Sequence, residues 1–280
     1  MTLQLEPASY APLADSRSAW YLRAEAAPPP GAAALLRLLG VADASVPDAA
    51  GEIAVATRRV RTGQTLFHEG ARADTLHFIG AGTFKTVHLA EDGYEQVLAF
   101  NGRGEVLGYD ALCTGTHPTT AVALEDSTVY GIAPADLSAL GRSVPGVEQV
   151  LQRELSRQLA QRAVVANLMA AVSAEVRLAR FLVHLSARMA ENGQSPRRLL
   201  LRMSRRDIAS HIGVAHETVS RSFSALVQWG CLAVCNREVE ILDAQRLQAC
   251  ARSTRGLLEA APGRAALRVV APAAPARCAA

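Results

Sequence analysis

The pattern of apolar and polar positions changes its period along the 280-residue chain. Between Ile53 and Ile132, short runs alternate apolar and polar positions, are rich in β-branched and aromatic residues, and are separated by glycine-containing turns. This texture predicts short antiparallel strands in a β-barrel or jelly roll over residues 51–140. The turns GAG and EDG each separate two alternating segments, which predicts a hairpin at each of them.

Beyond Pro145, apolar residues recur at intervals of three and four, and no glycine or proline lies between Val147 and Met189. This period predicts a long helix, or two helices nearly in continuation, with one apolar stripe. A helix that joins two domains has little of its own chain to cover such a stripe, so we expect a parallel partner helix in a homodimer, over residues 145–173. The stripe consists of Leu151, Leu155, Leu159, Val165, Met169 and Val172. Arg162 fills its gap, and we expect a packed stem and a solvated head there, with a tuning role at the dimer seam as the alternative.

Residues 203–223, MSRRDIASHIGVAHETVSRSF, carry start and stop signals for two helices. Ser204 and Asp207 form a capping-box pattern, so a helix should begin just after Ser204. Gly213 should end that helix, because glycine adopts the left-handed conformation cheaply. A second helix should begin near His216. The expected inward-facing residues are Ile208 and Ile212 on the first helix, Val219, Phe223 and Leu226 on the second, and small Ala209 where the axes cross.

Helix, three-residue turn and helix form the helix-turn-helix pattern. The segment that follows, CLAVCNREVEILD, predicts a small β-hairpin. We therefore expect a winged helix-turn-helix domain over residues 174–243, which makes the whole chain an α+β protein. The chain outside these domains is poor in packing signals: residues 1–50, rich in Ala and Pro, predict a poorly ordered leader with a short helix at Ala32–Leu39, and residues 244–280 predict a short helix and a disordered tail.

The exposed start of the second helix is the part of such a unit that enters the major groove of DNA. Here it carries His216, Glu217, Ser220 and Arg221. Arginine can donate two hydrogen bonds to guanine, glutamate can accept from cytosine, and a serine hydroxyl can do either. The flanking arginines, expected to pair with phosphates, are Arg197, Arg198, Arg202, Arg205 and Arg206. The alternative is an ordinary solvated face on which Glu217 and Arg221 support the helix as an i, i+4 pair.

Charge and composition favour the same half of the chain for a polyanionic partner. The net charge is only +3, but six arginines against Asp207 and Glu217 lie between residues 197 and 221, whereas acidic residues outnumber basic ones in the strand-rich half. No apolar run is long enough for a membrane span and no signal peptide is recognisable, so we expect a cytoplasmic protein without a membrane partner. The five cysteines are odd in number, as free thiols in a reducing compartment would be: Cys113, Cys231, Cys235, Cys250 and Cys278.

The segments GQTLFHEG, GEVLGYDAL followed by THPTTAVALEDS, and SRRDIASHIGVAHETVSR together resemble the CRP/FNR superfamily of bacterial transcription regulators, and its FNR branch most. The resemblance covers residues 51–243 and implies a cyclic-nucleotide-binding-like domain, a dimerisation helix and a winged helix. It also implies that Glu217, Ser220 and Arg221 read double-stranded DNA as a homodimer on a palindrome close to TTGAT-N4-ATCAA. A contact with RNA polymerase is implied for the exposed hairpin Glu91, Asp92, Gly93, Tyr94 and Glu95.

The chain departs from the resembled family in its cofactor and effector residues. A four-iron, four-sulfur cluster needs four thiolates, but no cysteine precedes Cys113, and Tyr130 stands where the resemblance places the ligand in the strand region. We therefore expect no cluster and no metal, and interpret Cys113 as a small core or loop residue. Tyr109 and Thr119 replace the ribose-binding glutamate and the phosphate-binding arginine that the resemblance implies for cyclic nucleotides, which disfavours that ligand.

Haem is not excluded, because His68, His77, His88 and His117 lie in the strand-rich domain, although no spacing marks one as an axial ligand. An enzyme is not expected: the H-x-H pair of metal-dependent cupins, phosphate loops and nucleophile elbows are all missing. Two mechanisms stay open. The protein is either a cluster-independent regulator, or a regulator whose strand domain binds haem, nitric oxide or another small molecule and shifts the dimer helices.

Overall fold

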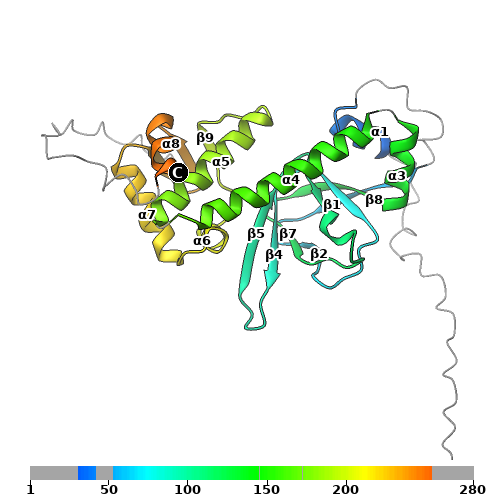
Figure 1. Cartoon of the computed structure of the whole chain (residues 1–280), viewed down its shortest axis with the longest axis horizontal. Coiled ribbons are helices and arrows are strands. Elements are labelled where there is room, and N and C mark those ends of the chain that lie inside the picture. The colour runs from blue at the N-terminus through cyan, green and yellow to red at the C-terminus, as the bar shows by residue number, and fades with distance from the viewer. Residues whose placement is uncertain (1–30, 42–52, 145, 172, 254–280) are drawn as a thin grey trace, which may run out of the picture.

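The computed structural model describes residues 31–41, 53–144, 146–171 and 173–253. Two folded parts lie at either side of a long diagonal helix, α4 (Figure 1). The N-terminal part contains two four-stranded antiparallel sheets. In order across the first sheet, the strands are β1 (Val55–Val60), β8 (Ser127–Ile132), β3 (Leu76–Ala81) and β6 (Val106–Leu107). Across the second sheet they are β2 (Thr65–Phe67), β7 (Thr120–Ala123), β4 (Phe84–Leu89) and β5 (Glu95–Asn101).

Inward-facing side chains of both sheets form one apolar core between them, as the alternating pattern predicts. Phe67 and Phe84 of one sheet pack with Ile79 and Val129 of the other. The predicted hairpin at EDG is confirmed, because β4 pairs with β5. The hairpin predicted at GAG is wrong: β3 and β4 belong to different sheets, and the chain crosses between them at Gly82. A Cβ at Gly82, where φ is +96°, would lie 2.0 Å from Ser127 Oγ, so glycine permits this crossing rather than a tight hairpin.

Three helical segments cover the outer face of the first sheet. They are α1 (Gly31–Leu38), α3 (Pro134–Ser143) and the start of α4. Leu35 and Leu36 are 0% and 3% exposed and pack in one cluster with Phe78. The short helix expected in the leader therefore exists, but it is part of the core. The Ala- and Pro-rich composition of the leader does not indicate this packing. It is nevertheless stable, because the two adjacent leucines of the short helix are enough to anchor it on the sheet. The rest of the leader lies outside the described residues.

The long helical region is two helices, α4 (Val147–Met169) and α5 (Ala174–Glu191), so of the two predicted alternatives, one helix or two in near-continuation, the second is present. The start of α4 packs apolar residues on the first sheet, but its middle turns face the β domain with polar residues: Gln158 Nε2 donates to Val106 O at 2.8 Å, and Gln161 Nε2 reaches Glu105 Oε1 at 3.3 Å. Leu155 and Leu159 point elsewhere and are 45% and 63% exposed. The middle of the helix therefore turns polar groups to its own domain and leucines to the outside.

The C-terminal part consists of α5, α6 (Arg205–Ile212), α7 (His216–Gln228) and α8 (Ala244–Arg252), with the strands β9 (Arg198–Leu200), β10 (Leu232–Cys235) and β11 (Glu238–Ile241). The predicted hairpin is present, with Asn236 at φ +53° in its turn, and β9 adds a third strand beside β11. Leu247 and Cys250 of α8 are buried in the same core as α5. The domain thus extends past Asp243, because α8 supplies core side chains; the tail beyond Ser253 lies outside the described residues.

Candidate nucleic-acid interface

The two-helix unit is positioned by the local signals that the sequence contains. The Ser204 hydroxyl accepts from the Asp207 amide at 3.1 Å while the Asp207 carboxylate accepts from the Ser204 amide at 2.9 Å, a complete capping box. Gly213 ends α6 at φ +66°, and α7 begins at His216. All six predicted inward-facing residues are 4% exposed or less. Local capping and one left-handed glycine therefore set the angle between the two helices.

The four candidate base-reading residues share one exposed face at the start of α7. His216, Glu217, Ser220 and Arg221 are all exposed, whereas Val219 between them is fully buried. The i, i+4 pair of Glu217 with Arg221 does not form: their side chains are not within ion-pair distance. The structure thus brings the four together and leaves their polar groups available to an external ligand.

The five candidate phosphate-binding arginines fall into two groups. Arg205 packs its guanidinium 3.4 Å above the centre of the Phe223 ring and donates to Asn236 O in the wing, and burial lowers its pKa. Arg202 pairs with Glu125 of the β domain at 3.0 Å. These two have structural partners. Arg197, Arg198 and Arg206 are exposed; Arg198 is 3.7 Å from Glu240, and Arg206 has no hydrogen-bond or ion-pair partner among the described residues.

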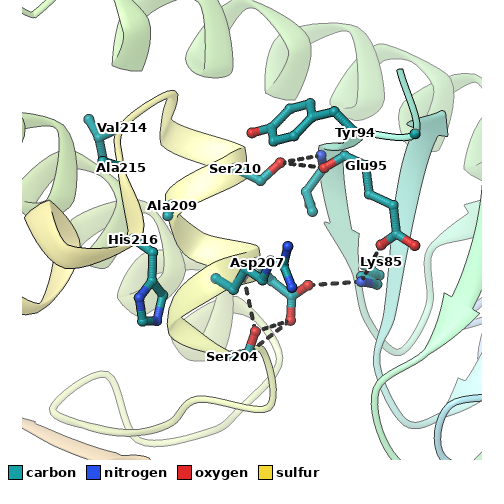
Figure 2. Close-up of a pocket in the computed structure, with 13 residues that line it drawn as sticks. Lys85, Tyr94, Glu95, Ser204, Asp207, Ala209, Ser210, Val214, Ala215 and His216 are labelled. Atoms are coloured by element: carbon teal, nitrogen blue, oxygen red, sulfur yellow. Dashed lines mark hydrogen bonds and ion pairs between the residues drawn. The ribbon is translucent and has the colours of Figure 1, made fainter. Parts of the chain in front are cut away.

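The sequence gives no sign that α6 docks on the β domain of the same chain (Figure 2). Strand β5 is the edge of its sheet, so the amide of Val97 and the carbonyl of Glu95 point away from β4. The Ser210 hydroxyl donates to Glu95 O at 2.8 Å and accepts from Val97 N at 2.8 Å. Gln96 Nε2 donates to Ser210 O at 2.7 Å. Helix α6 therefore covers an otherwise unpaired strand edge.

An ion-pair chain continues this contact. Lys85, the only lysine of the chain, lies 2.8 Å from Asp207 and 3.2 Å from Glu95. Burial alone would raise the pKa of Asp207, but hydrogen bonds from Lys85 and Ser204 outweigh it and hold that pKa below its usual value. Burial likewise opposes the charge of Lys85, and the two carboxylates nevertheless raise its pKa. Both partners thus stay charged near neutral pH in the contact between the domains.

Farther up the domain contact, Arg188 of α5 pairs with the buried carboxylate of Glu105 at 2.6 Å and donates to Phe100 O at 2.8 Å. His211 of α6 is buried between the rings of Phe100 and Phe181. Burial lowers its pKa to about 4, so the ring is neutral and suits this apolar site. These contacts hold the helix-turn-helix of α6 and α7, the reading unit, on β5.

A cavity of about 590 Å³ separates the β4–β5 hairpin from the start of α7. Tyr94 and Glu95 line it on one side and His216 on the other (Figure 2), and Arg206 is also among the lining residues. The candidate polymerase-contact residues Glu91, Asp92, Gly93, Tyr94 and Glu95 are all exposed at the hairpin tip. Glu95 differs from its neighbours, because its carboxylate pairs with Lys85 and its carbonyl accepts from Ser210.

The candidate dimerisation residues divide between covered and open positions. Leu155, Leu159 and Met169 are 40% to 63% exposed. Val165 is half-buried, and Leu151 packs at the edge of the cluster beneath α1 and α3. Arg162 is exposed and lies 3.5 Å from Asp110 of the β domain; Val172 lies outside the described residues.

Comparison with known proteins places these features in one family. A model of the cyclic nucleotide-binding domain matches residues 57–143, and a model of the Crp-like helix-turn-helix domain matches residues 176–250. The fumarate and nitrate reduction regulatory protein of Salmonella typhimurium is 36% identical over 198 residues, 71% of this chain and 79% of the relative. The protein of that name from Escherichia coli K12 is 35% identical over the same lengths. The chain belongs to the CRP/FNR family. It is therefore a DNA-binding transcription regulator, and its homologues are not enzymes.

A solved structure supports the same assignment. FixK2 from Bradyrhizobium japonicum matches with a TM-score of 0.62 and 26% identity, over 70% of this chain and 97% of that one. In the described part of the CRP/FNR chain, no helix is long and apolar enough to cross a membrane. Nor do three or more His, Cys, Asp or Glu side chains gather there as metal ligands.

Within the part of this CRP/FNR chain that the structure describes, the cysteines do not fit a four-thiolate cluster. Cys113 is an exposed loop thiol, and the position at which the resemblance places a ligand in the strands is Tyr130, whose ring packs against Gly80. Cys231 and Cys250 are buried in the C-terminal core, where burial raises the pKa of both thiols and opposes the thiolate form that ligates metal.

Proposed function

We propose that this chain acts in the cytoplasm as a homodimer that binds a palindrome close to TTGAT-N4-ATCAA, without an iron–sulfur cluster. One observation carries the proposal: Glu217, Ser220 and Arg221 stand exposed on one face of α7, and Glu217 and Arg221 are not paired with each other. Their donors and acceptors match those of base edges in the major groove. His216 at the N-terminus of the same helix adds a fourth polar group beside the groove.

The dimer is supported by the middle of α4, which turns polar side chains to its own β domain and leucines to the outside. Gln158 and Gln161 bond to the helix's own β domain, while Leu155 and Leu159 are exposed. Because these two leucines are about half exposed, burying them against a partner helix stabilises a parallel pair by about 1 to 2 kcal/mol for each side chain. A two-fold dimer also explains why the proposed DNA site is a palindrome.

Phosphate pairing is proposed for Arg206, with Arg197 and Arg198 in support, because these guanidinium groups reach solvent beside the reading unit. Arg205 stacks on Phe223 and serves the wing instead. The exposed tip Glu91–Glu95 is proposed as the surface that meets RNA polymerase. The β4–β5 hairpin extends beyond the rest of the β domain, so its tip is open to a partner (Figure 1).

The decisive experiment is fluorescence anisotropy of aerobically purified protein on a TTGAT-N4-ATCAA duplex and on a scrambled duplex at one fixed salt concentration. We expect a dissociation constant in the nanomolar range, about 10³-fold or more tighter than for the scrambled duplex. Equal and weak binding to both duplexes, in protein shown to be dimeric, would refute the proposed site.

A matched pair of variants separates phosphate pairing from structural support. Arg206→Ala should weaken both duplexes alike and lower the slope of log affinity against log salt by about one unit. Arg205→Ala should lower the thermal unfolding temperature of the wing-bearing domain and leave this slope nearly unchanged, because its guanidinium is occupied by Phe223. Equal slopes in both variants and the parent would contradict the assignment of Arg206.

The second candidate function is a regulator gated by a ligand of the β domain. A cavity in that domain, lined by His77 and His117, favours this alternative, because both rings keep a buried Nδ1 atom without a hydrogen-bond partner. Haem remains among the candidate ligands, with nitric oxide and other small molecules. A Soret absorbance band in untagged protein would support haem, and its absence after haem addition would remove haem from this alternative.

A further inference from the structure

The open end of the β sandwich contains a hollow that the two sheets do not fill. One row of paired residues crosses three strands there: Ala56 of β1, Gly131 of β8 and His77 of β3. The first two have almost no side chain, so the row leaves space beside the imidazole. The resulting cavity has a volume of about 570 Å³, within the range of small-molecule sites, about 300 to 1,000 Å³.

A stack of flat rings forms one wall of this cavity. The Phe67 and His117 rings lie 3.7 Å apart between centroids at an angle of only 9°, and Phe67 and His77 lie 5.9 Å apart at 21°. Nδ1 of His77 and Nδ1 of His117 are both buried without a hydrogen-bond partner. His117 is only 4% exposed. A Cβ built on Gly131 would lie 3.5 Å from His77 Nδ1, so this nitrogen faces the space that the glycine leaves.

The charge of the lining favours an anion. Arg72 is neutralised by Asp74 at 2.7 Å. Arg58 has no carboxylate within ion-pair distance among the described residues, and only its Nη1 is engaged, donating to Leu66 O at 3.2 Å. Burial and, to a smaller extent, the nearby charge of Arg58 lower the pKa of His77 to about 4. The imidazole is therefore neutral at pH 7 and can donate from Nδ1 in the matching tautomer.

We propose that this cavity binds a flat organic carboxylate. The carboxylate pairs with the free edge of Arg58 and accepts from Nδ1 of His77, and the flat apolar body lies against the Phe67 ring stack. A carboxylate supplies the negative charge that Arg58 lacks and a partner for a buried nitrogen, and each of these contacts is charge-assisted. The site lies apart from Tyr109 and Thr119, the positions of the nucleotide contacts that the family resemblance implies, which do not line it.

The proposed site has a short connection to the dimer helix. A Cβ on Gly108 would lie 3.2 Å from His117 Cε1, so the His117 ring rests on the turn that begins the segment Tyr109–Ala111. Asp110 in that segment pairs with Arg162 of α4 at 3.5 Å. The site therefore names a ligand class for the second candidate function, the ligand-gated regulator. Any effect of the ligand on DNA binding rests on that proposed function, whereas binding of the ligand itself does not require DNA.

The first test is calorimetric titration of the full-length protein with sodium benzoate and with benzamide, its neutral analogue of the same shape, without DNA. We expect saturable binding of one benzoate per chain and at least tenfold weaker binding of benzamide. Arg58→Gln should weaken benzoate at least tenfold, while Arg59→Gln should not, because Arg59 is the neighbour on the other face of β1 and does not line the cavity. Equal affinity for benzoate and benzamide, or equal effects of the two substitutions, would overturn the proposal.

A second measurement needs no variant and so cannot be confused with misfolding. In histidine ring proton spectra of the wild-type protein, benzoate should shift the signals of His77 and His117 and leave those of the other five histidines in place. Shifts confined to other histidines, or none at saturating benzoate, would overturn the proposal. Because neither test includes DNA, failure here leaves the palindrome proposal standing, and failure of palindrome binding leaves this one standing.

Discussion

Ser210→Ala tests whether α6 is held by the edge of β5. The Ser210 side chain is the only group that bridges the outward carbonyl of Glu95 and the outward amide of Val97, at 2.8 Å each, within the part of the chain that the structure describes. Ser210 is 6% exposed and Val97 is 2% exposed. Removing the hydroxyl therefore leaves a buried donor and a carbonyl without their partners, while the rest of the contact is unchanged.

The expected cost follows from these two hydrogen bonds. Each contributes about 0.5 to 1.5 kcal/mol, and a buried amide left unsatisfied costs about 1 to 3 kcal/mol. Alanine is a better helix former than serine, which returns about 0.5 kcal/mol. The docked state should lose about 2 kcal/mol relative to states in which α6 leaves β5. At 1.36 kcal/mol per factor of ten, this is about a 30-fold increase in the population of opened states.

Hydrogen–deuterium exchange measured by mass spectrometry reports this opening directly. Peptides that contain Val97 should exchange about 30-fold faster in Ser210→Ala than in the parent. Ser224→Ala is the matched control, because the Ser224 hydroxyl is exposed and bonds only within its own helix, to Ser220 O at 3.2 Å. Unchanged exchange around Val97 in Ser210→Ala, with the parent's unfolding temperature retained, would refute the docking argument.

Three further predictions concern the reading face, the dimer helix and pH. Arg221→Ala should weaken the binding free energy on the palindrome by about 1 to 3 kcal/mol and relax the preference for guanine at the base pair that Arg221 contacts. Fluorescence anisotropy on duplexes with single-base changes checks this, and an equal loss of affinity on scrambled DNA would contradict the base-reading role. Leu159→Glu should raise the dimer dissociation constant at least about tenfold in sedimentation equilibrium, unlike Ala160→Glu on an exposed position facing elsewhere. His77 and His211 have pKa values lowered to about 4, below the unfolded 6.5, so the unfolded chain binds protons at a higher pH than the folded one. The contribution of the two neutral rings to stability is therefore complete only above about pH 7.5, and the free energy of unfolding, measured in urea, should fall by about 3 kcal/mol from there to about pH 5.5. A flat or rising stability over that interval would show that the two rings are not buried as neutral groups.

The reading unit could be predicted in detail because its signals are local. The capping box spans four consecutive positions, and Gly213 ends the same helix, so a short segment of sequence specifies both ends of α6. The exposed face of α7 follows from helical periodicity once the start at His216 is known. Arg205 shows the limit of this reasoning: charge alone indicates a phosphate contact, but the Phe223 ring that holds its guanidinium becomes a neighbour only after the two helices have packed.

The docking of the two domains could not be predicted, because its partners are far apart in sequence. Ser210 and Glu95 are separated by 115 positions, and Lys85 and Asp207 by 122. Neither serine nor lysine has a periodic pattern that would indicate such a contact. The one signal in the sequence was its composition. The chain has a single lysine, Lys85, and it lies on β4, where its compact charge reaches the carboxylates of Glu95 and Asp207. The sheet crossing at Gly82 was missed for the same reason, since Ser127 approaches it from a distant strand.

Asp207 joins the local and the long-range parts of this structure. Its carboxylate caps α6 through Ser204 and also pairs with Lys85, so one group contributes both to the start of the helix-turn-helix and to its attachment to the β domain. In a two-fold dimer the separation of the two reading helices must equal one helical turn of DNA, about 34 Å. That separation is set by how α4 pairs and by how α6 sits on β5. Loosening the attachment should therefore weaken binding to the palindrome without changing the preferred bases, whereas loss of Arg221 should change the preferred bases as well.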